Sequence, residues 1–302
     1  MSHDHAHHAP GGGRGRAFAI GVLLNVGFVV VEAAYGILAH SMSLLADAAH
    51  NLSDVLGLLL AWGASALAQR SPSRRRTYGL RRSTILAALA NTILLLVAVG
   101  GVAWEAVRRI RTPAEVQGWT ILSVAAIGVV VNGLSAMLFM RDRHSDANVR
   151  GAFLHLVADA GVSLGVVLGG IAIIKTGWST VDPLVSLLVS AVVLFGTWGL
   201  LRDAVNLALD AVPPHIDPDA IRGFLASLPG VVAVHDLHIW AMSTTESALT
   251  VHLVMPWPDC APVFLETLPS ELHERFQIDH ATVQIEPDDP ERRCKQAPEH
   301  AL

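Results

Sequence analysis

The sequence predicts a transmembrane bundle of six helices followed by a C-terminal cytosolic α+β domain. The first reason is composition: the 302 residues are 52% hydrophobic and 16% charged, with a mean hydropathy of +0.47, whereas soluble domains carry about 25% charged residues. The second is segment length, because a bilayer core of about 30 Å takes roughly 20 apolar residues to cross. Six segments satisfy this, near 17–39, 44–68, 83–107, 118–140, 150–174 and 181–203.

The arginines that flank these segments predict the orientation. They concentrate before the first segment, between the second and third, and between the fourth and fifth. Loops rich in lysine and arginine stay in the cytoplasm. We therefore expect a multi-pass protein of the inner (plasma) membrane with both termini cytoplasmic. Asp182-Pro183 opens the sixth segment as a cap and first helical residue. The net charge of −5 gives no indication of a nucleic-acid partner.

From about residue 212 the pattern becomes that of a soluble domain. Asp217 caps a helix at 219–228, strands follow at 231–242 and 247–255, and a helix near 261–275 precedes a strand at 281–286. The order αββαβ predicts a two-layer, ferredoxin-like domain. We therefore divide the chain into a His/Gly-rich N-terminal tail (1–16), a six-helix transmembrane domain (17–211), the cytosolic domain (212–290) and a polar tail (291–302).

Two copies of one pattern lie inside apolar segments, His50-x-x-x-Asp54 and His155-x-x-x-Asp159. Residues four apart share a helix face, so each copy presents an imidazole and a carboxylate together. An aspartate at the centre of a membrane helix costs about 2.5–3.5 kcal/mol on insertion scales. Such groups pair, face water or bind a cation, and two imidazoles with two carboxylates suit zinc or a similar divalent metal. The pattern predicts a site that moves metal through the membrane.

Other polar residues leave alternatives open. Asp47 lies one turn before His50, where it either orients that ligand or bonds to a neighbouring helix. The N-terminal histidines either collect metal at the cytosolic mouth or belong to a tail without effect on transport. In the cytosolic domain, a metal site and ordinary surface histidines are both open interpretations; the candidate ligands are His235, His252, His280 and Glu286, with Cys294 following in the tail. His238 is a weaker candidate, because strand alternation points it away from His235.

Five motifs together resemble the cation diffusion facilitator family, and its zinc/cadmium branch in particular. They are SLLADAAHNLSD at 43–54, RTYG at 76–79, HLVAD at 155–159, DP at 182–183 and HDLHIW at 235–240. The resemblance covers residues 17 to about 290. It implies a homodimeric exporter that exchanges cytoplasmic divalent metal for protons, with His50, Asp54, His155 and Asp159 as transport ligands. Histidine at position 50, in place of a second aspartate, resembles members that prefer zinc and cadmium.

The resemblance also bears on the loop between the second and third segments. Some relatives carry aspartate and histidine ligands there, but residues 71–77 (SPSRRRT) offer none. A charge pair at the dimer interface is a further family feature. Arg82 and Asp210 occupy matching positions, and the alternative is that both are solvated charges.

The expected mechanism is competition between protons and metal. Metal ligands must be deprotonated, and histidine titrates near pH 6.5. Rocking of the helix bundle about the site then couples metal export to proton entry without ATP. The sequence accordingly has no Gly-x-x-x-x-Gly-Lys motif, which forms a phosphate-binding loop. Two alternative functions, from classes other than transporters, are those of an intramembrane zinc hydrolase and of a metal-sensing membrane scaffold. A hydrolase needs an open coordination position, which four protein ligands close. Zinc is the expected ion, with cadmium or cobalt as alternatives.

Overall fold

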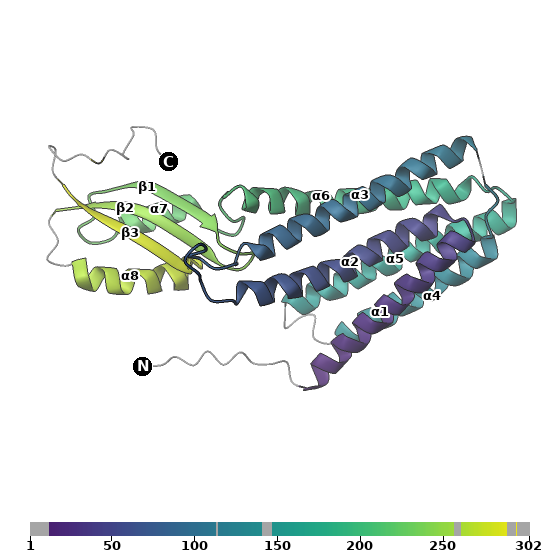
Figure 1. Ribbon diagram of the computed structural model, residues 1–302, viewed down its shortest axis with the longest axis horizontal. Coiled ribbons are helices and arrows are strands. Elements are labelled where there is room, and N and C mark those ends of the chain that lie inside the picture. The colour runs from purple at the N-terminus through teal and green to yellow at the C-terminus, as the bar shows by residue number, and fades with distance from the viewer. Residues whose placement is uncertain (1–11, 113, 141–146, 257–260, 289–293, 295–302) are drawn as a thin grey trace. The chain divides into compact units, whose positions relative to one another are not determined.

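The computed structural model describes residues 12–112, 114–140, 147–256, 261–288 and 294 (Figure 1). The histidines of the N-terminal tail and most of the polar C-terminal tail lie outside these residues. The chain divides into two compact units. One contains residues 1–59 with 91–198, and the other contains residues 60–90 with 199–302.

The described residues in the N-terminal two thirds of the chain form six helices, as predicted. They are α1 (Gly12–Leu38), α2 (Met42–Ala68), α3 (Ser83–Arg111), α4 (Gly118–Phe139), α5 (Ala147–Thr176) and α6 (Val181–Ala208). Helices α2 to α6 are long and apolar enough to cross a membrane, and α1 contains an apolar stretch at Asn25–Leu38. Large apolar side chains such as Leu188 and Phe195 are exposed on these helices. Helices suit the hydrocarbon core of a membrane, because their backbone N–H and C=O groups form hydrogen bonds within the helix.

Helices α4 and α5 pack antiparallel at close range. A Cβ atom at Gly128 would lie 3.1 Å from the Ser163 hydroxyl oxygen, and one at Gly170 would lie 3.0 Å from the Leu122 backbone nitrogen. Glycine is therefore required at both positions for this approach. The same contacts fix the register of the two helices, with three opposed pairs: Gly118 and Ile174, Leu122 and Gly170, and Gly128 and Ser163.

The beginning of α2 is capped by a residue of another helix. The sequence predicted that Asp182 caps α6, but α6 already starts at Val181, and the Asp182 carboxylate turns to α2 instead. It accepts hydrogen bonds from the backbone N–H groups of Met42 (2.6 Å) and Ser43 (3.2 Å) and from the hydroxyls of Ser41 and Ser43 (both 2.6 Å). A carboxylate at a helix N-terminus satisfies free N–H groups and is favoured by the helix dipole.

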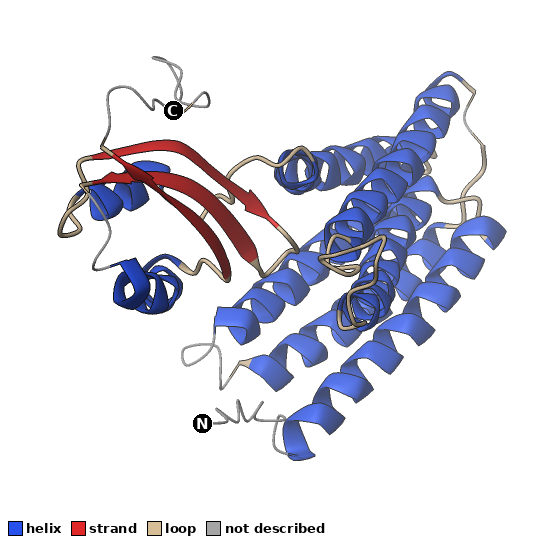
Figure 2. Cartoon of the chain, turned by 60° about the vertical axis from the view of Figure 1, so that its left-hand side comes forward, coloured by secondary structure: helices blue, strands red, loops and turns tan. Residues whose placement is uncertain are grey.

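The second unit contains the predicted α+β domain. Its elements are α7 (Pro218–Ala226), β1 (Ala233–Ala241), β2 (Ser247–Met255), α8 (Ala261–Phe276) and β3 (His280–Pro287), which confirms the order αββαβ. Strand β2 lies between β1, which is antiparallel to it, and β3, which is parallel to it. Figure 2 shows the three strands with their two helices. Ile221 and Leu225 of α7 and Leu268 and Leu272 of α8 close a core with the strands.

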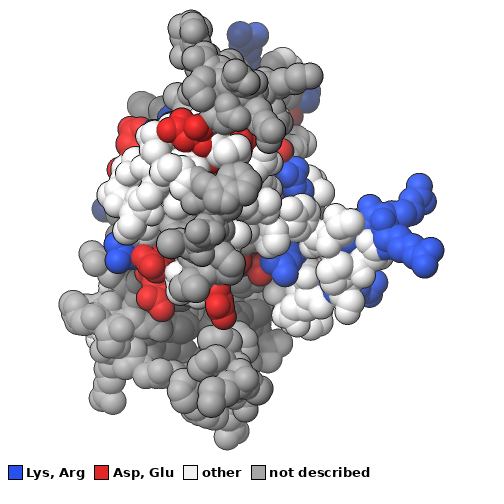
Figure 3. Space-filling model, turned by 90° about the vertical axis from the view of Figure 1, so that its left-hand side faces the viewer, with Lys and Arg blue, Asp and Glu red and all other residues white. Residues whose placement is uncertain are grey.

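The loop that joins α2 to α3 exposes a group of arginines. Arg70, Arg74, Arg75 and Arg76 are all exposed, and Figure 3 shows basic side chains gathered on a projecting part of the surface. Solvated guanidinium groups in such number keep a loop out of the hydrocarbon region. The loop therefore stays in the aqueous phase.

We predict that Asp182→Ala destabilises the protein, because it leaves four donors without their acceptor in a buried position. An unsatisfied buried donor costs about 1–3 kcal/mol. The melting temperature of the purified, metal-free protein should therefore fall. Asp203→Ala, which removes an exposed carboxylate from the same helix, is the control and should melt like the parent. Equal melting of both variants would contradict a capping role.

Candidate metal sites

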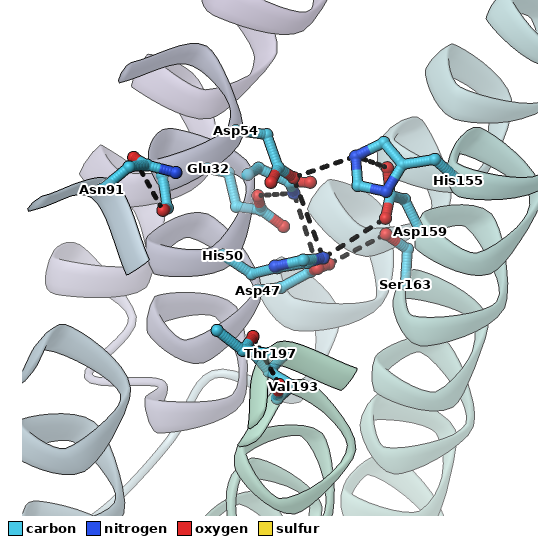
Figure 4. Close-up of polar contacts among 12 residues, drawn as sticks. Glu32, Asp47, His50, Asp54, Asn91, His155, Asp159, Ser163, Val193 and Thr197 are labelled. Carbon is cyan, nitrogen blue, oxygen red and sulfur yellow. Dashed lines mark hydrogen bonds and ion pairs between the residues drawn. The ribbon is translucent and has the colours of Figure 1, made fainter. Parts of the chain in front are cut away.

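The structure brings the four predicted transport ligands together between α2 and α5 (Figure 4). The His50 imidazole nitrogen Nε2 lies 3.3 Å from Asp159 Oδ1 on the other helix and 3.8 Å from Asp54 Oδ2 on its own. The His155 Nε2 atom lies 3.2 Å from Asp54 Oδ2 and 3.6 Å from Asp159 Oδ2. The ring centroids of the two histidines are 6.0 Å apart. Each imidazole therefore contacts one carboxylate within its helix and one across the helix interface.

These four side chains differ in burial. The Asp159 side chain is 5% exposed and that of His155 is 48% exposed, with His50 and Asp54 between them. One ligand atom each from His50, Asp54 and Asp159 lies within 4.8 Å of the others. With neutral imidazoles the four side chains together carry two negative charges, which a divalent cation neutralises. Nitrogen and carboxylate oxygen atoms in a group of four match the tetrahedral preference of zinc.

A network of buried polar side chains lies next to these four residues. Asp47, one turn before His50, accepts a hydrogen bond of 2.8 Å from the hydroxyl of Ser163 on α5, one turn after Asp159. The Asn51 amide donates to Glu32 of α1 at 3.2 Å and to Asp47 at 3.5 Å. Glu32 and Asp47 are fully buried. Asp47 thus bonds to a neighbouring helix, and it does so next to the candidate ligands.

A second group of candidate metal ligands lies on the three-stranded sheet. His235 of β1 pairs directly with His252 of β2, and their ring centroids are 5.1 Å apart. The Glu286 carboxylate of β3 lies 2.9 Å from His252 Nδ1 and 3.2 Å from His235 Nε2. Cys294 Sγ lies 3.6 Å from His252 Nδ1. One donor atom from each of the four residues lies within 4.8 Å of the others.

The protonation of Glu286 suits this group. Burial alone raises the pKa of its carboxyl, but hydrogen bonds from Cys294 and His235, together with the charge on His235, outweigh burial and hold the pKa below its usual value. Glu286 is therefore an ionised acceptor at neutral pH. A deprotonated carboxylate is the form that binds metal.

Two residues of the cytosolic domain are placed differently from the prediction. His280 of β3 pairs with Ala248 of β2, which lies four residues from His252 along the strand. At 3.3 Å per residue, about 13 Å separates His280 from the other candidate ligands. The His280 ring contacts Tyr78 instead. His238 shares a face with His235, because a β-bulge interrupts the strand between them. Asp236, at φ 52° in that bulge, lies 3.0 Å from His238 Nε2 and 3.5 Å from His252 Nε2.

Arg82 and Asp210, the expected dimer-interface charges, form an ion pair within the chain. Both side chains are about half exposed. Nearby, Arg81 lies 3.0 Å from Glu246, at the turn between β1 and β2. The two arginines just before α3 therefore contact the segment that follows α6 and the turn between β1 and β2.

Both parts of the chain match models of one protein family. Residues 18–207 match the cation efflux transmembrane domain, and residues 213–288 match the cytoplasmic domain of cation efflux proteins. The chain belongs to the cation efflux family. This membership confirms the resemblance to cation diffusion facilitators of the zinc/cadmium type. The protein is a multi-pass membrane transporter of metal cations and not an enzyme.

Several curated relatives match almost the whole chain. The cation efflux system protein CzcD of Alcaligenes sp. (strain CT14) is 35% identical over 95% of this chain and 90% of its own length. The zinc transporter ZitB of Escherichia coli (strain K12) is 36% identical over 95% and 93%, and the cadmium, cobalt and zinc/H(+)-K(+) antiporter of Bacillus subtilis (strain 168) is 33% identical over 95% and 92%. A solved metal-bound C-terminal domain of the CzcD transporter from Cuprividus metallidurans is 36% identical, covering 24% of this chain and 99% of that domain, with a TM-score of 0.22.

We predict that alanine at any one of His50, Asp54, His155 or Asp159 abolishes metal transport, because three donors no longer complete the group. Transport into sealed vesicles and size-exclusion chromatography measure this, and the variants should elute like the parent. Asp47→Ala should reduce transport less, since it removes the contacts with Ser163 and Asn51 but none of the four candidate ligands. Near-normal flux in two of the ligand variants would contradict a single four-ligand site.

For the cytosolic cluster (His235, His252, Glu286 and Cys294), we predict that zinc stabilises the isolated 212–302 fragment, whose core is self-contained. A ligand at a hundredfold excess over Kd adds about 2.7 kcal/mol, and each kcal/mol raises the melting temperature of a domain this size by about 4–8 °C. The double variant His235→Ala, His252→Ala should lose this rise, whereas His273→Ala, an exposed histidine on α8, should keep it. Unchanged melting of the parent fragment with zinc would show that the cluster does not bind metal.

Proposed function

We propose that this protein exports zinc, and also cadmium or cobalt, from the cytoplasm in exchange for protons. The observation that carries the proposal is the group of two imidazoles and two carboxylates between α2 and α5. Relatives named for zinc, or for cadmium, cobalt and zinc, support this set of ions. Zinc accepts nitrogen and oxygen ligands in tetrahedral geometry, and imidazole disfavours harder ions such as manganese.

Proton exchange follows from the same ligands. Each imidazole lies beside two carboxylates, whose negative charge stabilises either protons on the imidazoles or a divalent cation between them. A bound metal requires the imidazole nitrogen that faces it to be unprotonated. Metal and protons therefore compete for the same atoms. Alternating exposure of the site to the two sides of the membrane converts this competition into antiport.

The remaining assignments belong to the same proposal. We assign both termini and the α+β domain to the cytoplasm of a plasma-membrane protein, and the arginine-rich loop between α2 and α3 supports this orientation. The functional unit is a homodimer, and the pair formed by Arg82 and Asp210 lies at its interface. The cytosolic cluster binds metal and makes transport respond to the cytosolic metal concentration. The transmembrane domain ends near residue 211, and the cytosolic domain extends to about residue 290.

A metal-sensing scaffold is the alternative that transport measurements address. A scaffold binds metal at the cytosolic cluster but moves none. The family match favours transport, and the buried ligand group has no purpose in a cytosolic sensor. The intramembrane hydrolase is excluded, because the family consists of transporters.

Zinc uptake into proteoliposomes under an imposed pH gradient tests the function. With an acidic lumen and a neutral exterior, protons leave as zinc enters, so lumenal zinc should rise and the lumen should become more alkaline. A protonophore added before zinc dissipates the gradient, so it should suppress zinc uptake and leave no zinc-dependent change in lumenal pH; Asp54→Ala vesicles should show neither zinc uptake nor zinc-dependent alkalinisation. Zinc uptake that ignores the gradient would contradict proton antiport, and absence of uptake would favour the scaffold.

His50→Asp should loosen metal selectivity, because it replaces an imidazole with a harder carboxylate oxygen ligand. We expect manganese flux to rise relative to zinc flux in proteoliposomes, with zinc transport retained in part. The reverse control, Asp54→His, should not favour manganese. An unchanged flux ratio in an active His50→Asp protein would show that this residue does not select the ion.

A further inference from the structure

Asn132, in the middle of α4, is a buried polar residue without an evident purpose. Its side chain is 0% exposed, and neither its amide nitrogen nor its amide oxygen has a hydrogen-bond partner among the residues that the structure describes. Leaving such a group unsatisfied costs about 1–3 kcal/mol, whereas an apolar residue of similar size would avoid this cost. The amide therefore needs an explanation beyond packing.

The register of α4 and α5 places Asn132 at the transport site. Gly128 lies against Ser163, and the two helices are antiparallel. One turn forward from Gly128 reaches Asn132, and one turn back from Ser163 reaches Asp159. These two residues are thus opposite each other. Gly128 also packs against Phe28 of α1, since a Cβ there would lie 2.7 Å from Phe28 Cζ, so this face of α4 points into the helix bundle.

Metal binding changes what Asp159 needs. Its two oxygens lie near His50 and His155, and both contacts are made through the Nε2 atoms that face the site (Figure 4). Once each of these nitrogens gives its lone pair to a cation, neither can donate a hydrogen bond to Asp159. The carboxylate then binds the ion with one oxygen and leaves the other, in a buried position, without a donor.

We propose that the Asn132 amide N–H group donates to the free oxygen of Asp159 when metal occupies the site. Asn132 is then a positioning residue that holds the carboxylate in its ligating orientation. This inference rests on the proposed function, since it assigns Asp159 to the transport site. Outer hydrogen bonds of this kind change metal affinity by 10–100-fold when they are removed.

The test is zinc binding by the full-length protein in lipid nanodiscs, measured by calorimetry. The parent carries His235→Ala and His252→Ala to silence the cytosolic cluster, and a matching Asp54→Ala protein gives the background of other zinc sites. We expect Asn132→Leu, which keeps the volume and removes the donors, to weaken zinc binding by about 10–100-fold. Asn132→Gln, which keeps an amide, should recover part of the affinity.

The matched control is Ser135→Ala. Ser135 lies one turn further along α4, and its hydroxyl is also buried without a partner in the described part of the chain, but it faces the level of Leu156. We expect its zinc affinity to stay within about twofold of the parent, and the metal-free Asn132→Leu protein to melt no lower than the parent. If that protein fails to fold, Asn132→Ala replaces it.

Three results would overturn the inference: zinc affinity of Asn132→Leu within twofold of the parent, an equal loss in Ser135→Ala, or a loss explained by a lower metal-free melting temperature. Binding and transport are measured on the same proteins. A parent that binds zinc at the Asp54-dependent site but transports none refutes the proposed function. In that case the zinc affinities of the Asn132 variants still decide whether Asn132 positions Asp159.

Discussion

The contacts of two histidines with two aspartates across α2 and α5 are the constraint on which the rest of the molecule depends. Ionisable groups within a membrane helix cost several kcal/mol unless they are paired or bind a cation, and these four are paired between helices as well as within them. A shift of α2 along α5 by one turn would separate the pairs. The register of these two helices therefore determines whether the four side chains can act together as the proposed transport site.

Contacts at several positions along α2 and α5 fix that register. Asp182 holds the beginning of α2, and Asp47 bonds to Ser163 one turn away from the ligands. Gly128 allows α4 to approach the same serine closely. Each of these contacts joins different helices through buried polar groups or through the absence of a side chain. Together they explain why the core around the site is polar, while the outward-facing residues are apolar.

The sequence could predict what depends on local periodicity and chemistry. The i, i+4 spacing placed His50 with Asp54 and His155 with Asp159, and charge at that depth implied that the pairs meet. It could not predict contacts that depend on helix packing, such as Asp182 capping α2 or Asn132 lying opposite Asp159. In the cytosolic domain, strand alternation misplaced His238 because a bulge at Asp236 has no signature in this sequence. His280 was grouped with the cluster by residue type, and its register on β3 separates it.

X-ray absorption spectroscopy of zinc in the membrane site is a direct test of whether two histidines and two aspartates bind one ion. The sample is the full-length protein in nanodiscs with the cytosolic cluster silenced and one equivalent of zinc. We expect four nitrogen or oxygen neighbours at about 2.0–2.2 Å, with a multiple-scattering signal from two imidazoles and no sulfur. A spectrum with a sulfur neighbour, with one imidazole, or with six oxygen ligands would contradict the assignment of two histidines and two aspartates to one site.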